Sequence, residues 1–204
     1  MIKENLEKEL IKLEAYESSI KKLFKSLNRE VHYPFDLMVN SVLDRALHLI
    51  FGFTQLIRDE NSIAAYHLIR CHLDNILRFY AAWLVEDPHD FALKIIKGKK
   101  ISDLKDRTGQ QMKDWYLKEQ LNRIFPWIND LYKETSGFIH FSKNHVFSSS
   151  ELINADNAIV LFSLSKKDRN ISDKSIVEAT NAMQNITEAL CGITEGWINV
   201  KFNR

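Results

Sequence analysis

The chain has 204 residues, with 28 Lys and Arg against 27 Asp and Glu, so its formal net charge is +1. Hydrophobic residues make up 45% of it, and it contains only six Gly and three Pro. This composition is typical of an ordinary globular protein and excludes collagen-like, low-complexity and largely disordered chains. The near-zero net charge excludes a globally basic nucleic-acid binder, although a local basic patch remains open, and we expect no sequence readout of DNA.

Residues 2–29 form the first predicted helix. Large apolar side chains recur there at helical spacing among many Lys and Glu, which predicts a long amphipathic helix with a narrow apolar stripe. A narrow stripe with charged flanks is also typical of a helix that packs against a second copy. Residues 1–30 are therefore a candidate dimerisation helix, and a homodimer is one expected assembly.

Further helices follow along the chain. Pro34 suits the start of the second, Asn61 and Ser62 suit the cap of the third, and Pro126 predicts a kink or a break in a later one. The predicted ranges are 35–58, 63–86, 89–96, 113–137 and, after a cap at 172–173, a final helix that reaches 202.

Residues 146–165 carry the one strand prediction. The segments 146–150 and 158–164 flank the turn-rich 154–157, which by residue type predicts a small β-hairpin. No linker divides the chain and no internal repeat is present. The predicted fold is therefore all-α, a single-domain bundle of five to seven helices over residues 1–204, with a small β-hairpin insert before the C-terminal helix.

The helix predicted at 63–86 carries a narrow charged stripe. Four ionisable side chains share an arc of about 80° on the helical wheel: His67, Arg70, Asp74 and Arg78. Apolar side chains occupy most of the remaining circumference, so the stripe faces either solvent or an internal polar pocket. In solvent it would form only weak i,i+4 ion pairs. In a pocket, Asp74 is the expected partner of both arginines, and two arginines against one carboxylate leave a positive site for an anion.

A second set of polar residues lies at the end of the helix predicted at 113–137. Lys133, Ser136 and His140 stand at i, i+3 and i+7, so in helical geometry they share a face. A histidine at a helix C-terminus either transfers protons near neutral pH or forms a structural hydrogen bond across the bundle. We expect Tyr132, Ser136 and His140 to form the second wall of the anion pocket.

Short motifs on these helices resemble a group of uncharacterised bacterial helical proteins. The motifs are Arg70-x-His72-Leu73-Asp74, Asp87-Pro88, Leu131-Tyr132-Lys133, Ser136 and His140-Phe141-Ser142. More distantly, a basic residue followed at short spacing by a histidine is similar to the HEPN superfamily, whose all-α domains include metal-independent RNases and toxin or anti-phage proteins. This resemblance implies a catalytic role for His140 as the acid–base group, with Lys133 in place of the family's arginine, and RNA phosphate as the ligand. The lysine is a departure, because it is a point charge on a flexible stem and lacks the planar fork of arginine.

The segment 94–107 is a local basic patch. Its six Lys and Arg against Asp103 and Asp106 give a local charge of +4. It lacks the interleaved aromatic residues that stack on bases, which favours a solvated loop over a phosphate-binding one. Four nearby aromatic residues are predicted to lie in the core rather than to form a ligand platform: Trp115, Tyr116, Phe125 and Trp127.

Several kinds of protein are disfavoured by motifs that are missing. The sequence contains no GxGxxG, Walker, HExxH or GxSxG motif, so we expect no cofactor. Five candidate metal ligands lack the spacing of a helical metal site and lie beside Arg70, so we expect no metal; they are His67, His72, Asp74, His140 and His145. Cys71 and Cys191 lie far apart in the sequence. We expect both to be buried thiols in a protein of a reducing compartment. No secretion signal and no apolar run of about 18 residues is present, which favours a cytoplasmic protein without a membrane partner.

Three functional hypotheses follow from these patterns. The first is a cytoplasmic bacterial helical bundle with a binding or interaction role that uses the anion pocket, linked by resemblance to phage defence or a toxin–antitoxin pair. The second is a HEPN-like ribonuclease that uses His140 with Lys133 or Arg70. The third is a structural partner that dimerises through its first helix.

Overall fold

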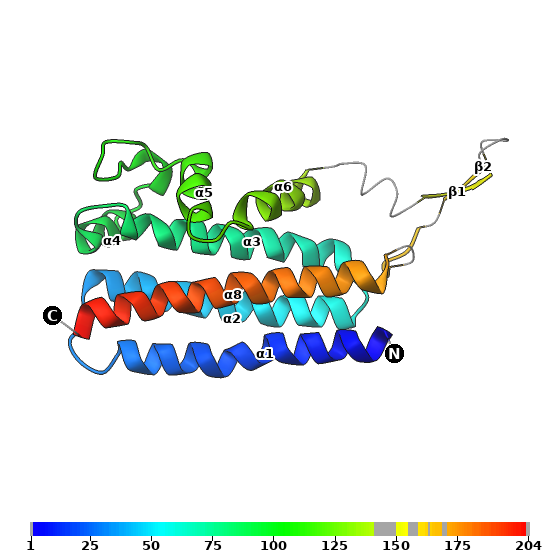
Figure 1. The fold of residues 1–204 in the computed structure, drawn as a ribbon, viewed down its shortest axis with the longest axis horizontal. Coiled ribbons are helices and arrows are strands. Elements are labelled where there is room, and N and C mark those ends of the chain that lie inside the picture. The colour runs from blue at the N-terminus through cyan, green and yellow to red at the C-terminus, as the bar shows by residue number, and fades with distance from the viewer. Residues whose placement is uncertain (1, 141–149, 155–158, 163, 169–170, 203–204) are drawn as a thin grey trace.

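Four long helices run side by side and form the main bundle, as Figure 1 shows for the computed structural model of the chain. The structure describes residues 2–140, 150–154, 159–162, 164–168 and 171–202. In these ranges the helices are α1 (Ile2–Leu27), α2 (Pro34–Arg58), α3 (Ser62–Tyr80), α4 (Pro88–Ile96), α5 (Asp114–Asn122), α6 (Ile128–Ile139) and α8 (Asp173–Phe202), with single 3₁₀ turns η1 (Ala81–Trp83) and η2 (Ile101–Asp103). The fold is all-α.

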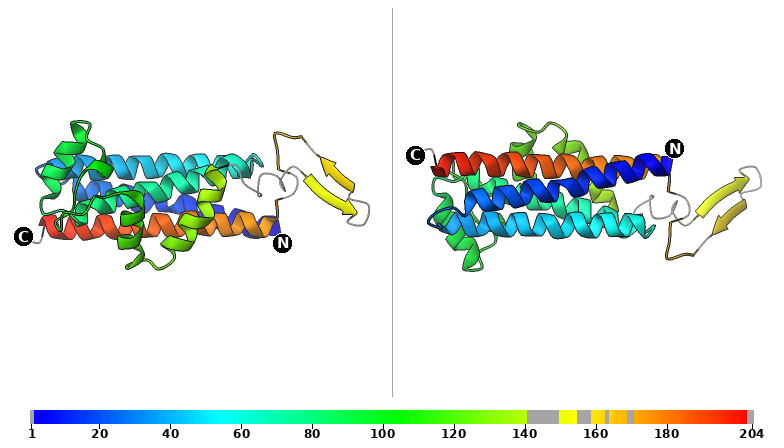
Figure 2. Two further views of the ribbon diagram at one scale, coloured as in Figure 1. Left: turned by 90° about the horizontal axis from the view of Figure 1, so that it is seen from above. Right: turned by 90° about the horizontal axis from the view of Figure 1, so that it is seen from below.

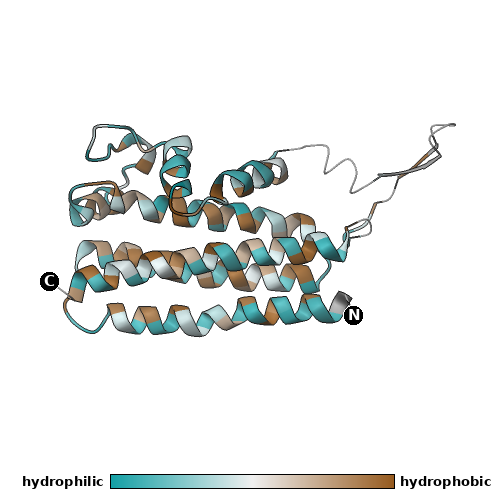
Figure 3. Cartoon of the chain, in the orientation of Figure 1, coloured by the Kyte–Doolittle hydropathy of each residue, from teal (hydrophilic) through white to brown (hydrophobic). Residues whose placement is uncertain are grey.

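The core lies between α1, α2, α3 and α8. Helix α1 packs on α8 and α2, and α3 packs on α2 and α8, so each long helix has two long neighbours (Figure 2). Hydrophobic and polar residues alternate along α1, as Figure 3 shows by hydropathy. The apolar stripe of α1 is buried within its own chain, through residues such as Leu10, Leu13, Ile20, Leu23 and Leu27. A homodimer through α1 stays a prediction.

Helix α8 buries a stripe of threonines against the other long helices. Thr180, Thr187 and Thr194 stand seven residues apart and are fully buried. Each hydroxyl donates a hydrogen bond to the carbonyl oxygen four residues earlier, at 2.8–2.9 Å. Because a buried hydroxyl is costly only when it lacks a partner, these bonds make the stripe compatible with a dry core.

A buried ion pair joins the start of α2 to the last turn of α8. The carboxylate of Asp36 accepts hydrogen bonds from Lys201 Nζ at 2.8 Å, from Trp197 Nε1 at 2.9 Å and from the Tyr33 N–H at 2.8 Å. Phe35 packs beside this pair, with its ring centroid 4.6 Å from that of Trp197. The network fixes the end of the bundle at which the C-terminus lies.

The predicted range 113–137 is interrupted at Pro126, where a kink or a break was predicted. It forms two helices, α5 and α6, because Pro126 lacks an N–H and clashes with the preceding turn. The helix predicted at 63–86 ends at Tyr80 and continues as η1. Asp87 then accepts hydrogen bonds from the N–H groups of His89 and Asp90 and so caps α4.

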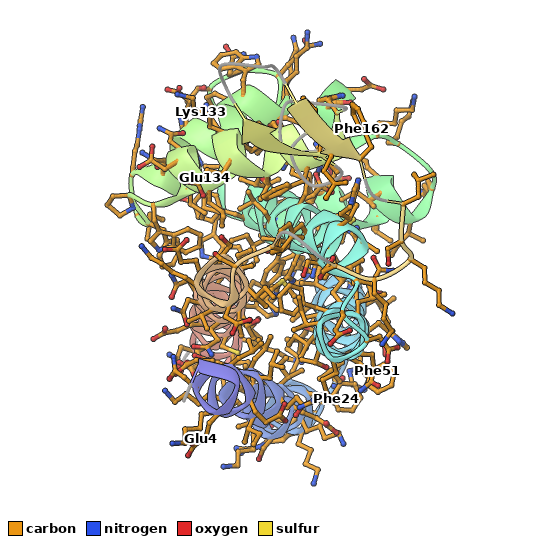
Figure 4. All side chains as sticks on the ribbon, turned by 90° about the vertical axis from the view of Figure 1, so that its right-hand side faces the viewer. Glu4, Phe24, Phe51, Lys133, Glu134 and Phe162 are labelled. Carbon is orange, nitrogen blue, oxygen red and sulfur yellow. The ribbon has the colours of Figure 1, made fainter. Side chains whose placement is uncertain are left out.

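The segment before α8 contains two short strands that lie beyond the end of the bundle (Figures 1 and 2). Strand β1 (Ser150–Asn154) pairs antiparallel with β2 (Ile159–Phe162), with a register irregularity between Leu152 and Asn154. The strand predicted at 146–150 falls mostly outside the described residues, and the observed β1 begins where that prediction ends. Phe162 is labelled on this projecting segment in Figure 4, and its side chain is exposed.

Candidate functional site

A solvent-open pocket of about 280 Å³ lies between α3 and α6, with one contribution from α2. Its lining consists of Arg45, Arg70, Cys71, Asp74, Tyr132, Ser136, Ile139 and His140. On α3, Arg70 and Asp74 are one turn apart, and on α6 the residues at 132, 136 and 140 follow the same spacing. Because α3 packs directly on α6, these two polar rows face each other across the pocket.

Arg70 is the central cation of this pocket. Its guanidinium carbon lies 3.8 Å from the centroid of the Tyr132 ring, in a cation–π contact. One of its terminal nitrogens, Nη1, is buried without a hydrogen-bond partner among the described residues. A buried N–H without an acceptor is costly, so this nitrogen is a ready donor for an anionic ligand.

Arg78 neutralises the carboxylates beside the pocket. The sequence predicted that Asp74 would pair with both arginines of the stripe, but among the described residues its ion pair is with Arg78, with Nε and Oδ1 3.2 Å apart. Arg78 also bonds Asp114 at the start of α5. Because Asp74 is shared with Arg78, it offers little repulsion to an anion that approaches Arg70.

His140 lies at the rim of the pocket, as the residue that ends α6. Its backbone N–H donates to the carbonyl oxygen of Ser136 at 3.3 Å, and its ψ of 140° turns the chain out of the helix. The ring is exposed, and it forms no hydrogen bond with another described residue. The predicted alternative of a structural bond across the bundle therefore has no counterpart in the described part of the chain.

Ser136 and Lys133 take different positions. The Ser136 hydroxyl donates to the Tyr132 carbonyl oxygen at 2.8 Å, so it faces the pocket with its lone pairs. Lys133 is exposed on α6 and does not line the pocket (Figure 4). The three residues were predicted to share one face of the helix, but of the three only Ser136 and His140 line the pocket.

His67 and Arg78 also lie outside the pocket lining. The Nδ1 of His67 is 2.8 Å from the Ile63 carbonyl oxygen, so the ring is bonded to its own helix. Of the seven predicted wall residues, the pocket brings together five: Arg70, Asp74, Tyr132, Ser136 and His140. That these residues bind a ligand stays a prediction.

Arg45 and Cys71 line the pocket, and the sequence reasoning missed their place in it. Arg45 is exposed on α2, and the packing of α2 against α3 brings it here. Cys71, predicted to be buried, is half-buried at the pocket wall. For Cys191 the prediction is correct, and burial raises the pKa of its thiol to about 11.

Behind the pocket, His72 is fully buried. Its Nε2 lies 3.0 Å from Thr187 Oγ1. Because that hydroxyl gives its proton to the Met183 carbonyl, His72 Nε2 must be the donor, which makes the ring the neutral Nε2–H tautomer. Burial, with a smaller effect of Arg45, lowers the pKa of His72 to about 3. This histidine is a core residue and is not a proton carrier for the pocket.

Metal-ligand geometry is not found in the described ranges, where no three His, Cys, Asp or Glu side chains group as a metal site. The candidate ligand His145 lies outside those ranges. None of the described helices combines the length and the hydropathy that a membrane crossing needs.

Comparison of the chain with protein-family models, with curated proteins and with solved structures gives no match. The resemblance to uncharacterised bacterial helical proteins and to the HEPN superfamily therefore stays an expectation from its motifs. The geometry of the pocket carries the functional argument.

Proposed function

We propose that this chain is a binding protein that holds a small anionic group, a phosphate or a carboxylate, in the pocket between α3 and α6. The observation that carries the proposal is the unpartnered Nη1 of Arg70, buried beside Tyr132 at the wall of an open pocket. A cytoplasmic location in a bacterium, a homodimer and a link to phage defence or to a toxin–antitoxin pair are further parts of this proposal, supported only by the sequence patterns.

The chemistry favours an oxyanion. A guanidinium is planar, stays charged at physiological pH and presents parallel N–H donors that match the oxygens of phosphate and carboxylate. The stack on Tyr132 holds this plane in one orientation, so little conformational entropy is lost when the ligand binds. Arg45, on α2, adds a second positive charge to the pocket lining.

Replacement of Arg70 with glutamine is expected to weaken the binding of inorganic phosphate by at least about tenfold, since a charge-assisted hydrogen bond contributes about 1.5–3 kcal/mol. Isothermal titration calorimetry at low salt measures this. The matched control is Lys133→Gln, which removes an exposed charge from α6 outside the pocket and should leave the affinity unchanged. Equal phosphate affinity in the wild type and in Arg70→Gln would contradict the proposal.

A second candidate function is metal-independent RNA cleavage. The observation that favours it is that His140 and Arg70 line one pocket, whereas Lys133 does not. Such cleavage needs a base that takes the proton from the 2′-hydroxyl and a cation that offsets the charge growing on the phosphate. His140 and Arg70 supply these two groups, so Arg70 would take the place that the resemblance gives to Lys133.

A cleavage assay on single-stranded and structured RNA tests this candidate. Wild-type protein should cleave at least one substrate, His140→Ala and Arg70→Gln should lose that cleavage by about 10²-fold or more, and Lys133→Gln should retain it. If no cleavage depends on His140, the nuclease is excluded while the anion-binding proposal stands on its own titration.

A further inference from the structure

A second pocket, of about 590 Å³, shares Tyr132 with the first. Tyr132 lines both pockets, so the two pockets adjoin at this residue. The second pocket is built from η2 and the start of α5 and includes Ser102, Gln111, Lys113 and Trp115. Pockets that hold small organic ligands have volumes of roughly 300–1,000 Å³, and the second pocket lies in this range.

Trp115 is the unusual feature of the second pocket. The sequence predicted it to be a core residue, but 55% of it is exposed. Its ring meets the Tyr116 ring edge-on at 5.8 Å, and the Tyr116 hydroxyl is in turn bonded to Asp106 at 2.5 Å. The indole is therefore a fixed, solvent-facing aromatic surface, which is the kind of platform on which a planar heterocycle stacks.

Two cations contact the shared Tyr132 ring. Arg70 lies over the Tyr132 ring at 3.8 Å, and Lys118 lies 5.5 Å from the same centroid. Arg78 bonds Asp74 of the first pocket and Asp114 of the second, so one arginine neutralises a carboxylate on each side. The residues that line the two pockets include three cations and three carboxylates, Arg45, Arg70 and Lys113 against Asp74, Asp103 and Asp114, and Arg78 adds a further cation through its bonds to two of these carboxylates.

We infer, on the basis of the anion-binding function proposed above, that the two pockets form one site for a nucleotide unit. The phosphate binds Arg70 in the first pocket, and the base stacks on Trp115 in the second, with the sugar crossing Tyr132. A sugar phosphate or a carboxylic acid would use only the first pocket and would leave the Trp115 platform unused. The same chemistry is presented by a free mononucleotide and by one unit of a single strand.

The test is calorimetric titration of the full chain with inorganic phosphate, adenosine, adenosine monophosphate and a 5′-phosphorylated adenosine dinucleotide. Adenosine monophosphate should bind about tenfold more tightly than phosphate, which is within the range that stacking of one base contributes. Trp115→Ala should remove that gain and leave the phosphate affinity unchanged. The matched control, Phe51→Ala, removes an aromatic side chain that is 66% exposed on α2 and should change neither affinity.

The outcomes separate the inference from the function on which it rests. Suppose that phosphate binding depends on Arg70 but adenosine monophosphate binds no more tightly than phosphate, or that Trp115→Ala still binds adenosine monophosphate more tightly than phosphate. In either case the nucleotide site is wrong and the anion site stands. If Arg70→Gln changes neither affinity, both are wrong. If the dinucleotide binds more tightly than the mononucleotide, the site is confirmed and its ligand is one unit of a single strand. If the two bind equally, the site is confirmed and its ligand is a free nucleotide.

Discussion

Replacement of Lys201 with methionine is expected to lower the free energy of unfolding by about 3–5 kcal/mol, because it leaves the carboxylate of Asp36 buried without its counter-ion. The side chain of Asp36 is fully buried and that of Lys201 is 4% exposed, so water cannot replace the lost partner. For a chain of this size the loss corresponds to a decrease in melting temperature of roughly 6–20 °C. Urea titration and thermal melting followed by circular dichroism measure both quantities.

The matched control is Lys174→Met, on the same helix. Lys174 forms an ion pair with Glu178, but its side chain is 85% exposed, so the loss there should stay below about 0.5 kcal/mol. A second variant, Lys201→Met with Asp36→Asn, removes both charges and should recover part of the stability. If Lys201→Met is no less stable than Lys174→Met, the buried pair does not hold the end of the bundle.

The protonation of Asp36 fits this account. Burial by itself raises the pKa of Asp36, but hydrogen bonds from Lys201, from the Tyr33 N–H and from Trp197 outweigh it and lower the pKa below its ordinary value. A carboxyl with a lowered pKa in the folded state stabilises the fold above its unfolded pKa of about 3.9, and that contribution is lost as the pH falls. The pair is therefore fully effective at neutral pH.

Wild-type protein is expected to lose about 2 kcal/mol of stability between pH 6.5 and pH 5 through His72 alone. Burial lowers the pKa of this histidine to about 3 in the folded chain, whereas the unfolded chain has the ordinary value of about 6.5. Below pH 6.5 the unfolded state binds a proton at this histidine and the folded state does not. The free energy of unfolding therefore decreases by up to about 1.4 kcal/mol per pH unit, down to the pKa of the folded state. Arg45 of α2 acts in the same direction, and Thr187 of α8 is the neutral partner.

His72→Gln isolates this contribution, because glutamine can still donate to Thr187 but does not titrate in this range. Its stability at neutral pH can differ from that of the wild type, but its stability should change less steeply between pH 7 and pH 5. His67→Gln, on the exposed side of the same helix, should keep the wild-type slope. If the slopes of the wild type and of His72→Gln coincide, His72 is not the buried neutral histidine that the structure shows.

Much of the fold could be predicted from local patterns. The apolar spacing over 2–29 and 173–202, Pro34 at the start of α2 and Asn61 at the start of α3 all correspond to observed helices. The buried pair of Asp36 and Lys201 could not be predicted, since the two residues are 165 positions apart and each is an ordinary surface type in sequence.

The candidate site shows the same limit. Arg70, Asp74 and the α6 residues at 132, 136 and 140 were predicted because i,i+4 spacing on a helix is visible in sequence. Arg45 and Trp115 were not, because the packing between helices decides which side chains reach a common pocket and which aromatic ring is left exposed. Lys133 does not line the pocket, because the packing of α6 against α3 decides which part of a helical face borders the pocket, and the helical wheel does not show this.

Anomalous diffraction from crystals grown with tungstate tests most directly whether Arg70, with its unpartnered Nη1, binds an oxyanion. The account predicts a tungsten peak in the pocket between α3 and α6, within hydrogen-bond distance of the Arg70 guanidinium, that disappears in Arg70→Gln and persists in Lys133→Gln. A pocket without tungsten in the wild type, or a peak that survives in Arg70→Gln, would contradict it.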